Sequence, residues 1–264
     1  MASLLDSVLE RLGGWLLPPR CVLCDAAGQP PCLDLCTDCD AELPATPPAC
    51  PRCAARIAWG VPNGVCCERC AGNPPPYARC HAAFRYAAPM DALVQALKYR
   101  GRLTISRVLG ELLARSVTRA GLGADVILPV PLHPLRHAER GFNQATQIAR
   151  WTARRLELCC DPTLATRRVA GSRQVGLSAV ERRLNLQGAF TANGQRVRGR
   201  HVALIDDVLT TGSTAAALAD ACLRAGAARV DVWCVALAEQ PGGPRGEPTQ
   251  RLHCVQMNDN GEPQ

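Results

Sequence analysis

Four Cys-x-x-Cys pairs follow one another between residues 21 and 70, and this feature restricts the fold more than any other. Two residues between cysteines let one tight turn present both thiolates to a single tetrahedral metal ion, and two such turns complete a Cys₄ shell. The simplest pairing joins the first two turns and then the last two, although an interleaved pairing also fits the spacing and Cys66 could replace Cys67. The eight cysteines are Cys21, Cys24, Cys36, Cys39, Cys50, Cys53, Cys67 and Cys70.

We expect the metal to be zinc, one or two ions in a structural role, because a segment this short and poor in large apolar side chains could not fold alone. Disulfides would require export. The first residues carry Asp6, Glu10 and Arg11 within their apolar pattern and so form no export signal. Iron–sulfur ligation is the other alternative, which cysteine spacing does not separate from zinc. No apolar run approaches the roughly 18 residues that span a membrane, so we expect a cytoplasmic protein.

The sequence changes character after Cys80. Eleven of the 16 cysteines lie between Cys21 and Cys80, and the stretch that follows alternates helical and strand patterns. This alternation predicts an α/β fold, a parallel sheet flanked by helices. The predicted strands are 126–130, 202–205 and 230–238, and the predicted helices are 90–100, one containing 105–113, 143–156 and 214–225. The expected units are an N-terminal amphipathic helix (1–20), a double zinc ribbon (21–80), the α/β domain (81–239) and a flexible tail (240–264).

The segment 202–214 is the most informative part of the α/β domain. Its apolar strand delivers two adjacent carboxylates, Asp206 and Asp207, to the C-terminal edge of the sheet, where open α/β sheets bind ligands. The loop that follows opens a helix, so its N–H groups and hydroxyls suit a phosphate, and Gly212 allows close approach of the backbone. Carboxylates would repel a phosphate bound beside them. Their presence is explained if they bind sugar hydroxyls or if Mg²⁺ bridges the negative charges. The alternative is an ordinary helix cap beside solvated acids. The hydroxyl-bearing side chains are Thr210, Thr211, Ser213 and Thr214.

This segment resembles the motif that binds phosphoribosyl pyrophosphate (PRPP) in type I phosphoribosyltransferases, an apolar run, two acids and Thr-Thr-Gly-x-Thr. The chain outside the N-terminal helix and the tail resembles the ComF family of competence-associated proteins. The residues that support this resemblance are the four cysteine pairs, Leu-Lys-Tyr-Arg-Gly at 97–101, Pro-Val-Pro-Leu at 129–132, Arg-Gly-Phe-Asn-Gln at 140–144, Arg182 with Asn185, and the acidic-pair loop.

The resemblance implies a role for each part of the site. Asp206 and Asp207 would hold the ribose 2′- and 3′-hydroxyls of PRPP, and residues 210–214 would receive its 5′-phosphate, with Mg²⁺ accompanying the ligand. The loop after residues 128–131 would approach the pyrophosphate, with Arg136 and Arg140 as candidate catalytic charge partners.

Four further positions have both a functional and an ordinary interpretation. Arg173 and Arg182 lie where related enzymes carry a covering loop, but they could also be solvated. The ordinary interpretation of Asn143 is that it serves as a helix cap and nothing more. The ordinary interpretation of Lys98 is that it is the usual basic residue near a helix end.

Charge is distributed unevenly along the chain. Residues 98–200 hold 19 basic and 6 acidic side chains, a balance of +13. Such an excess favours anionic partners, although an arginine-rich composition can also be merely solvated.

Three functions fit these features. The first is a ComF-like protein that binds PRPP and supports DNA uptake in natural transformation, handling single-stranded DNA with proteins of the uptake machinery. The second is a phosphoribosyltransferase of nucleobase salvage, and the third is a non-catalytic PRPP sensor that regulates a partner. The sequence identifies no acceptor, so whether the protein is an enzyme stays open.

Overall fold

The computed structural model describes residues 18–29, 33–57, 64–167 and 188–238. The helix expected over residues 1–20, except for its last three residues, and the tail expected over 240–264 lie outside this part of the chain. Arg173, Arg182 and Asn185 also lie outside it, as do Cys32 and Cys254.

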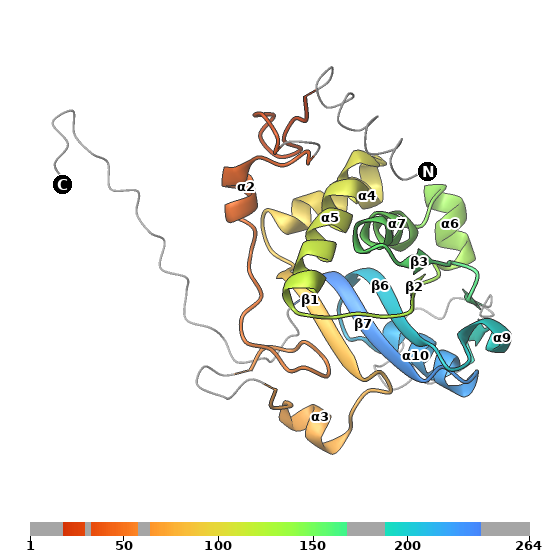
Figure 1. Cartoon of the computed structure of the whole chain (residues 1–264). Helices are drawn as coiled ribbons and strands as arrows, with labels where there is room; N and C mark the ends of the chain where they lie inside the picture. The colour runs from red at the N-terminus through yellow and green to blue at the C-terminus, as the bar shows by residue number, and fades with distance from the viewer. Residues whose placement is uncertain (1–17, 30–32, 58–63, 168–187, 239–264) are drawn as a thin grey trace, which may run out of the picture.

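The centre of the molecule is a parallel sheet of five strands, which confirms the predicted mixed α/β fold (Figure 1). Its strands β6 and β7 are buried along almost their whole length, as expected for strands covered on both faces. The order across the sheet is β1 (Arg79–Arg85), β7 (Arg229–Leu237), β6 (His201–Leu209), β2 (Val126–Pro129) and β3 (Cys159–Cys160).

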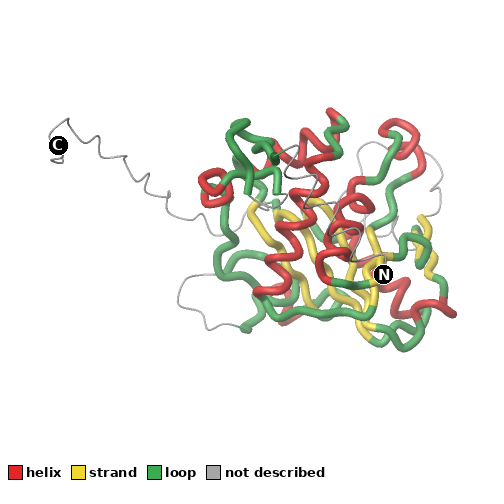
Figure 2. The backbone as a smooth tube through the Cα atoms, turned by 45° about the horizontal axis from the view of Figure 1, so that its top comes forward, coloured by secondary structure: helices red, strands yellow, loops and turns green. Residues whose placement is uncertain are grey.

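Helices cover both faces of this sheet, as Figures 1 and 2 show. One face packs against α4 (Met90–Arg100), α5 (Thr104–Arg119) and α7 (Gln144–Leu156). Gly110 allows α5 and α7 to approach closely, because a Cβ there would lie 2.4 Å from Cβ of Trp151. The other face packs against α10 (Ser213–Arg224) and a small antiparallel pair, β4 (Ala165–Arg167) with β5 (Phe190–Ala192). The short helices are α2 (Thr37–Ala41), α3 (Glu68–Gly72), α6 (Pro134–Arg140) and α9 (Gly194–Val197).

The predicted helices and strands occur within a residue or two of their expected bounds, with one informative difference. The strand expected to end at Ile205 continues to Leu209 and keeps pairing with β7. On its other side, the pairing with β2 ends where Pro129 meets Ile205. The two acids therefore stand within β6 but just beyond the end of β2. Sequence reasoning placed the end of the strand too early because charged residues are uncommon inside buried strands.

The cysteine-rich segment lies along the edge of the sheet. Between its two halves, Ala45 pairs with Phe84 of β1, and the Arg85 N–H donates to the Pro44 carbonyl at 2.9 Å. The Thr46 hydroxyl donates to the Ala82 carbonyl at 3.0 Å. These contacts cover part of the free edge of β1, which would otherwise expose unpaired backbone groups.

Candidate functional site

The eight cysteines of the Cys-x-x-Cys pairs gather into two separate clusters. Within each cluster all four sulfur atoms lie within 4.8 Å of one another. The pairing is sequential rather than interleaved, and Cys67 rather than Cys66 belongs to the second cluster. The clusters are Cys21, Cys24, Cys36 and Cys39, and Cys50, Cys53, Cys67 and Cys70.

The spacing of the sulfur atoms fits tetrahedral zinc. A Zn–S bond of about 2.3 Å in a tetrahedron separates neighbouring sulfurs by about 3.8 Å. Sγ of Cys24 lies 3.6 Å from Sγ of Cys36, and Sγ of Cys53 lies 3.7 Å from Sγ of Cys67. The backbone N–H of Cys67 also donates to Sγ of Cys50 at 3.3 Å, a contact that favours the thiolate.

The close packing of the thiols also indicates a bound cation, because neighbouring thiols oppose one another's ionisation. A hydrogen bond with Cys36 and another with Cys24 raise the pKa of Cys39. Burial raises the pKa of Cys70, and a hydrogen bond with Cys53 adds to this effect. Four thiols packed this closely cannot all ionise without a positive ion among them, so the clusters support structural zinc.

The two clusters attach to different parts of the α/β body. Asp40 of α2 forms a bidentate ion pair with Arg115 of α5, with N–O distances of 2.7 and 2.9 Å. Near the second cluster, the Arg52 guanidinium donates to the carbonyls of Pro75 and Ala78, at 2.9 and 3.2 Å. Because both contacts join residues far apart in the sequence, each cluster is held in a defined place beside the sheet.

At the C-terminal edge of the sheet, Asp207 meets Lys98 of α4, and Asp206 precedes Asp207 on β6. The Lys98 ammonium Nζ lies 2.9 Å from Oδ2 of Asp207, and their side chains are only 20% and 11% exposed. Each carboxylate also accepts the backbone N–H of the next residue, at 2.9 Å for Asp206 and 2.7 Å for Asp207. These backbone contacts fix both carboxylates at the strand end.

The environment of Asp206 favours its protonated form. Burial raises the pKa of Asp206 to about 8, and the negative charge of Asp207 beside it contributes further. Lys98 acts in the opposite direction, but not enough to restore an ordinary carboxyl pKa. Near pH 7 Asp206 therefore keeps its proton. A bound cation, or hydroxyl groups that donate hydrogen bonds to the carboxylate, could take the place of this proton.

The loop after β6 turns sharply into α10. Gly212 has a φ of +73°, a left-handed conformation that glycine adopts without strain, and it forms the N-cap of the helix. The hydroxyls of Thr211 and Ser213 lie 2.9 Å apart, and both Thr210 and Thr211 are exposed. The 12-residue helix directs its free N–H groups and positive dipole end into this loop, which suits an anion.

Arginine side chains approach the acids from two other elements. Arg167, at the end of β4, is close enough to Asp206 and to Arg136 for both charges to influence its pKa, which burial lowers. Arg140 lies farther along α6, over the ring of Tyr99. Of the two arginines predicted from the sequence, Arg136 lies within electrostatic range of Arg167, and Arg140 lies beside Tyr99.

Sequence reasoning missed Arg167 and the pairing of Lys98 with Asp207. No local pattern marks Arg167, because its position depends on how β4 packs over the sheet. Lys98 carries a weak signal, since it is the only lysine of the chain. Asn143 caps α7, as one of its two interpretations held, and its side chain also donates to the Val130 carbonyl at 2.9 Å.

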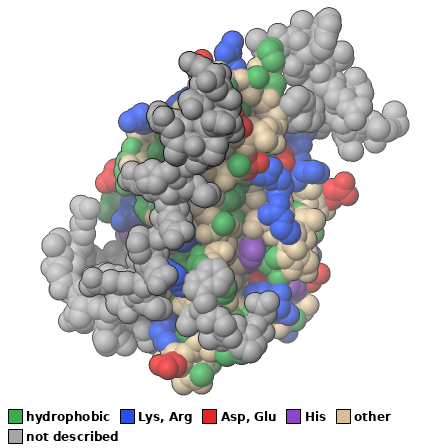
Figure 3. Space-filling view, turned by 90° about the vertical axis from the view of Figure 1, so that its left-hand side faces the viewer, with side chains coloured by type: hydrophobic (Ala, Val, Ile, Leu, Met, Phe, Trp, Pro, Cys, Tyr) green, Lys and Arg blue, Asp and Glu red, His purple; other side chains and the backbone are tan. Residues whose placement is uncertain are grey.

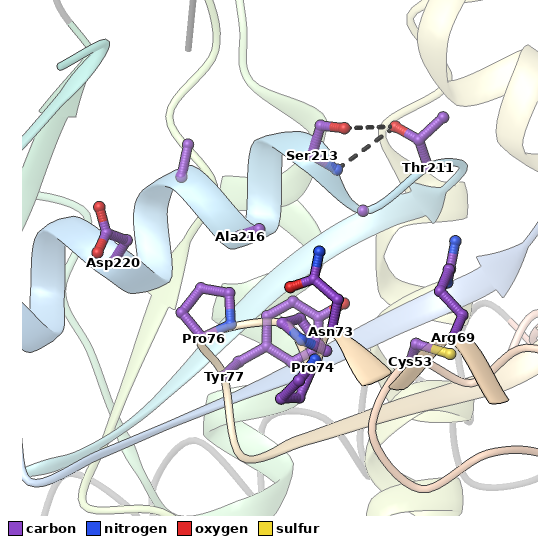
Figure 4. A pocket seen from close by; sticks show the side chains of 13 residues that line it. Cys53, Arg69, Asn73, Pro74, Pro76, Tyr77, Thr211, Ser213, Ala216 and Asp220 are labelled. Carbon is purple, nitrogen blue, oxygen red and sulfur yellow. Dashed lines mark hydrogen bonds between the residues drawn. The ribbon is translucent and has the colours of Figure 1, made fainter. Parts of the chain in front are cut away.

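A cavity of about 440 Å³ lies behind the loop that joins β6 to α10, between α10 and the second cysteine cluster (Figure 4). Tyr77, which is only 3% exposed, forms part of its wall. A Cβ on Gly212 would lie 3.2 Å from the Tyr77 hydroxyl, so this ring supports the loop from behind. The acid pair is not among the residues that line the cavity, which are Cys53, Arg69, Asn73, Pro74, Pro75, Pro76, Tyr77, Thr211, Gly212, Ser213, Ala216, Ala217 and Asp220.

The basic excess does not form one continuous patch on the face drawn in Figure 3, where blue side chains are interspersed with red ones. Among the residues that the structure describes, no helix has both the length and the apolar character needed to cross a bilayer.

Comparison with known proteins agrees with these features. The double zinc ribbon family model matches residues 12–71. The DNA utilization protein YhgH of Escherichia coli (strain K12) is 38% identical over 209 residues, which cover 76% of this chain and 89% of the relative. Competence protein F of Haemophilus influenzae is 30% identical over 211 residues, covering 77% and 90%.

Solved structures that match part of the chain include two proteins whose names refer to PRPP or to phosphoribosyl transfer. The glutamine PRPP amidotransferase from B. subtilis is 21% identical, with a TM-score of 0.35, and the match covers 48% of this chain but only 25% of the amidotransferase chain. A hypoxanthine-guanine-xanthine phosphoribosyltransferase is 13% identical, with a TM-score of 0.30 and coverage of 55% and 70%.

The parallel sheet and the two Cys₄ clusters define a mixed α/β protein with an N-terminal double zinc ribbon. The chain belongs to the ComF family, the family of the DNA utilization protein YhgH and Competence protein F.

Proposed function

We propose that the protein binds PRPP with Mg²⁺ at the C-terminal edge of the sheet. The observation that supports this most directly is the acid pair at the end of β6, followed immediately by a glycine-capped turn at the start of α10. An anion-binding turn next to two carboxylates suits a ligand that presents a phosphate and sugar hydroxyls on neighbouring atoms.

In this proposal the acidic side chains bind the sugar, and the basic side chains bind the pyrophosphate. Asp206 and Asp207 accept hydrogen bonds from the ribose 2′- and 3′-hydroxyls, and residues 210–214 hold the 5′-phosphate with backbone N–H groups and hydroxyls. Arg167 lies within electrostatic range of Asp206 and of Arg136, and these two arginines would attract the pyrophosphate. Bound Mg²⁺ would neutralise pyrophosphate charge, and carboxylates held this close together fit a site that receives a cation.

We also propose that the protein acts in DNA uptake, handling single-stranded DNA in the cytoplasm with proteins of the uptake machinery. The names of the relatives, a DNA utilization protein and a competence protein, support this role. The basic excess of residues 98–200 supports it independently, because phosphate contacts supply most of the affinity for nucleic acid.

Calorimetric titration with PRPP and Mg²⁺ tests the binding site. The wild-type protein should bind, and the double variant Asp206→Ala/Asp207→Ala should lose binding while its far-UV circular dichroism spectrum stays unchanged. Equal affinity in both proteins would refute the site.

Adding nucleobases or single-stranded DNA to the same mixture then separates the three functions. Pyrophosphate release with a nucleobase would establish a salvage transferase. Binding of PRPP without turnover, together with a copurifying protein, would establish a sensor, and binding of single-stranded DNA that weakens steeply with salt supports the DNA role.

A further inference from the structure

An exposed aromatic ring lies on α4, one residue after the lysine that contacts Asp207. Tyr99 follows Lys98 on α4, and it is 74% exposed, the most exposed of the large hydrophobic side chains that the structure describes. The guanidinium carbon of Arg140 lies 5.3 Å from the centroid of the Tyr99 ring. Because a ring this exposed is covered on one face only, its other face is free to stack against a planar ligand.

Further basic side chains lie close in the chain to Tyr99 and to Arg140. Arg100 and Arg102 follow Tyr99 at the end of α4, and Arg136 and His137 come from α6, beside Arg140; all four are exposed. No ion pair joins any of these four side chains to another residue within the described ranges. Glu139 is the one acidic residue of α6. The surface therefore combines an aromatic face with an excess of positive charge.

We propose that Tyr99, flanked by Arg140, is a stacking platform for a base of single-stranded nucleic acid, and that the neighbouring arginines hold its backbone. Proteins that bind single strands without sequence preference combine aromatic stacking with a cationic track in this way. A free nucleobase could stack on the ring, but it carries no phosphate for the neighbouring arginines to bind. The positive charge therefore favours a nucleic-acid strand as the ligand. A duplex keeps its bases stacked inside and could not offer one to Tyr99.

The position of Tyr99 relates this inference to the proposed function. The inference rests on that proposed function. Tyr99 is adjacent in the chain to Lys98, whose ammonium contacts Asp207. A base stacked on Tyr99 would thus lie beside the proposed PRPP site, so the strand and the phosphoribosyl ligand would occupy neighbouring parts of one surface.

Fluorescence anisotropy with a labelled oligothymidylate tests the proposal. Removing one base–aromatic stack costs about 1–3 kcal/mol, so Tyr99→Ala should weaken binding by roughly 5- to 150-fold, whereas Tyr99→Phe should stay within about twofold of wild type. Arg102→Ala should lower the slope of log affinity against log salt, because it removes a phosphate contact. Tyr99→Ala should leave that slope unchanged. Arg200→Ala, an exposed arginine just before β6 at the opposite edge of the sheet, is the matched control and should bind as wild type.

Three results would overturn the proposal. Wild-type affinity in Tyr99→Ala would show that the ring is not used, and equally tight binding of a duplex or of free thymine would show that a strand is not what it recognises. Absence of any oligonucleotide binding by the wild-type protein would do the same. Calorimetry of Tyr99→Ala with PRPP and Mg²⁺ is run in parallel, because failure of the platform leaves that binding intact, whereas failure of the proposed PRPP site removes it from wild type as well.

Discussion

The ammonium of Lys98 and the carboxylate of Asp207 meet at 2.9 Å and join the end of α4 to the end of β6. Lys98 is the only lysine in a chain whose other 29 basic residues are arginines. The ammonium group of Lys98 approaches the acid pair from α4. Its positive charge partly offsets the repulsion between the two carboxylates.

Removal of Lys98 should destabilise the fold. Lys98→Met leaves a partly buried carboxylate without its partner, and we expect a loss of about 1–3 kcal/mol in the free energy of unfolding, measured with urea at pH 7. The double variant Lys98→Met/Asp207→Asn should recover most of this loss, because no charge is then left unpaired. Equal losses in the single and double variants would contradict the coupling.

The acid pair should make stability depend on pH. The pKa of Asp206 is raised to about 8 in the folded protein but is about 3.9 in an unfolded chain. The folded state therefore binds more protons than the unfolded state between these values. The contribution of Asp206 is fully favourable below pH 4 and is lost as the pH rises toward 8.

Comparison with Asp206→Asn isolates this effect. The asparagine variant lacks the titration, so its advantage in stability over wild type should grow between pH 5 and pH 8, by up to about 1.4 kcal/mol for each pH unit. Urea unfolding of both proteins at each pH measures the difference. A difference that stays constant with pH would mean that Asp206 is ionised throughout the range.

Each cysteine cluster should hold its own zinc ion. Elemental analysis of the purified protein should give about two zinc ions per chain, falling to about one when Cys39→Ser or Cys53→Ser removes a ligand. The two variants should differ in PRPP binding, because Cys53 and the loop residues Thr211–Ser213 line the same cavity, whereas Cys39 of α2 does not line it. We expect weaker binding in Cys53→Ser only; iron, or no metal, in the wild-type protein would overturn the assignment.

Gly212 should tolerate no side chain. An alanine there would adopt a φ of +73° and place its Cβ 3.2 Å from the Tyr77 hydroxyl, so the loop must shift. We expect Gly212→Ala to weaken PRPP binding by tenfold or more in calorimetry and to cost about 1 kcal/mol of stability.

Gly121→Ala is the matched control for this substitution. Gly121 has a φ of +62° with nothing within 4 Å of a Cβ, so it should cost stability alone. Tyr77→Phe in the Gly212→Ala background should restore part of the binding if the contact with the hydroxyl matters. Unchanged PRPP affinity in Gly212→Ala would place the phosphate elsewhere.

Local features of the sequence determined much of this protein. Cysteine spacing identified the eight ligands in four Cys-x-x-Cys turns, because two ligands on one turn depend only on neighbouring residues. Helical and strand periodicity located three strands of the sheet, β2, β6 and β7, and the helices α4, α5, α7 and α10 for the same reason. The run from Val202 to Thr214 identified the strand, the acids and the loop, since all three are consecutive in the chain.

Only the tertiary structure decided which distant residues meet at those features. The sequential pairing of the cysteines, the contact of Lys98 with Asp207, the approach of Arg167 to Asp206 and the support of Gly212 by Tyr77 all join segments far apart in sequence. Such contacts follow from strand order and from the packing of helices on each face, which no local pattern encodes. The raised pKa of Asp206 has the same origin, because burial and the approach of charges are properties of the packed chain.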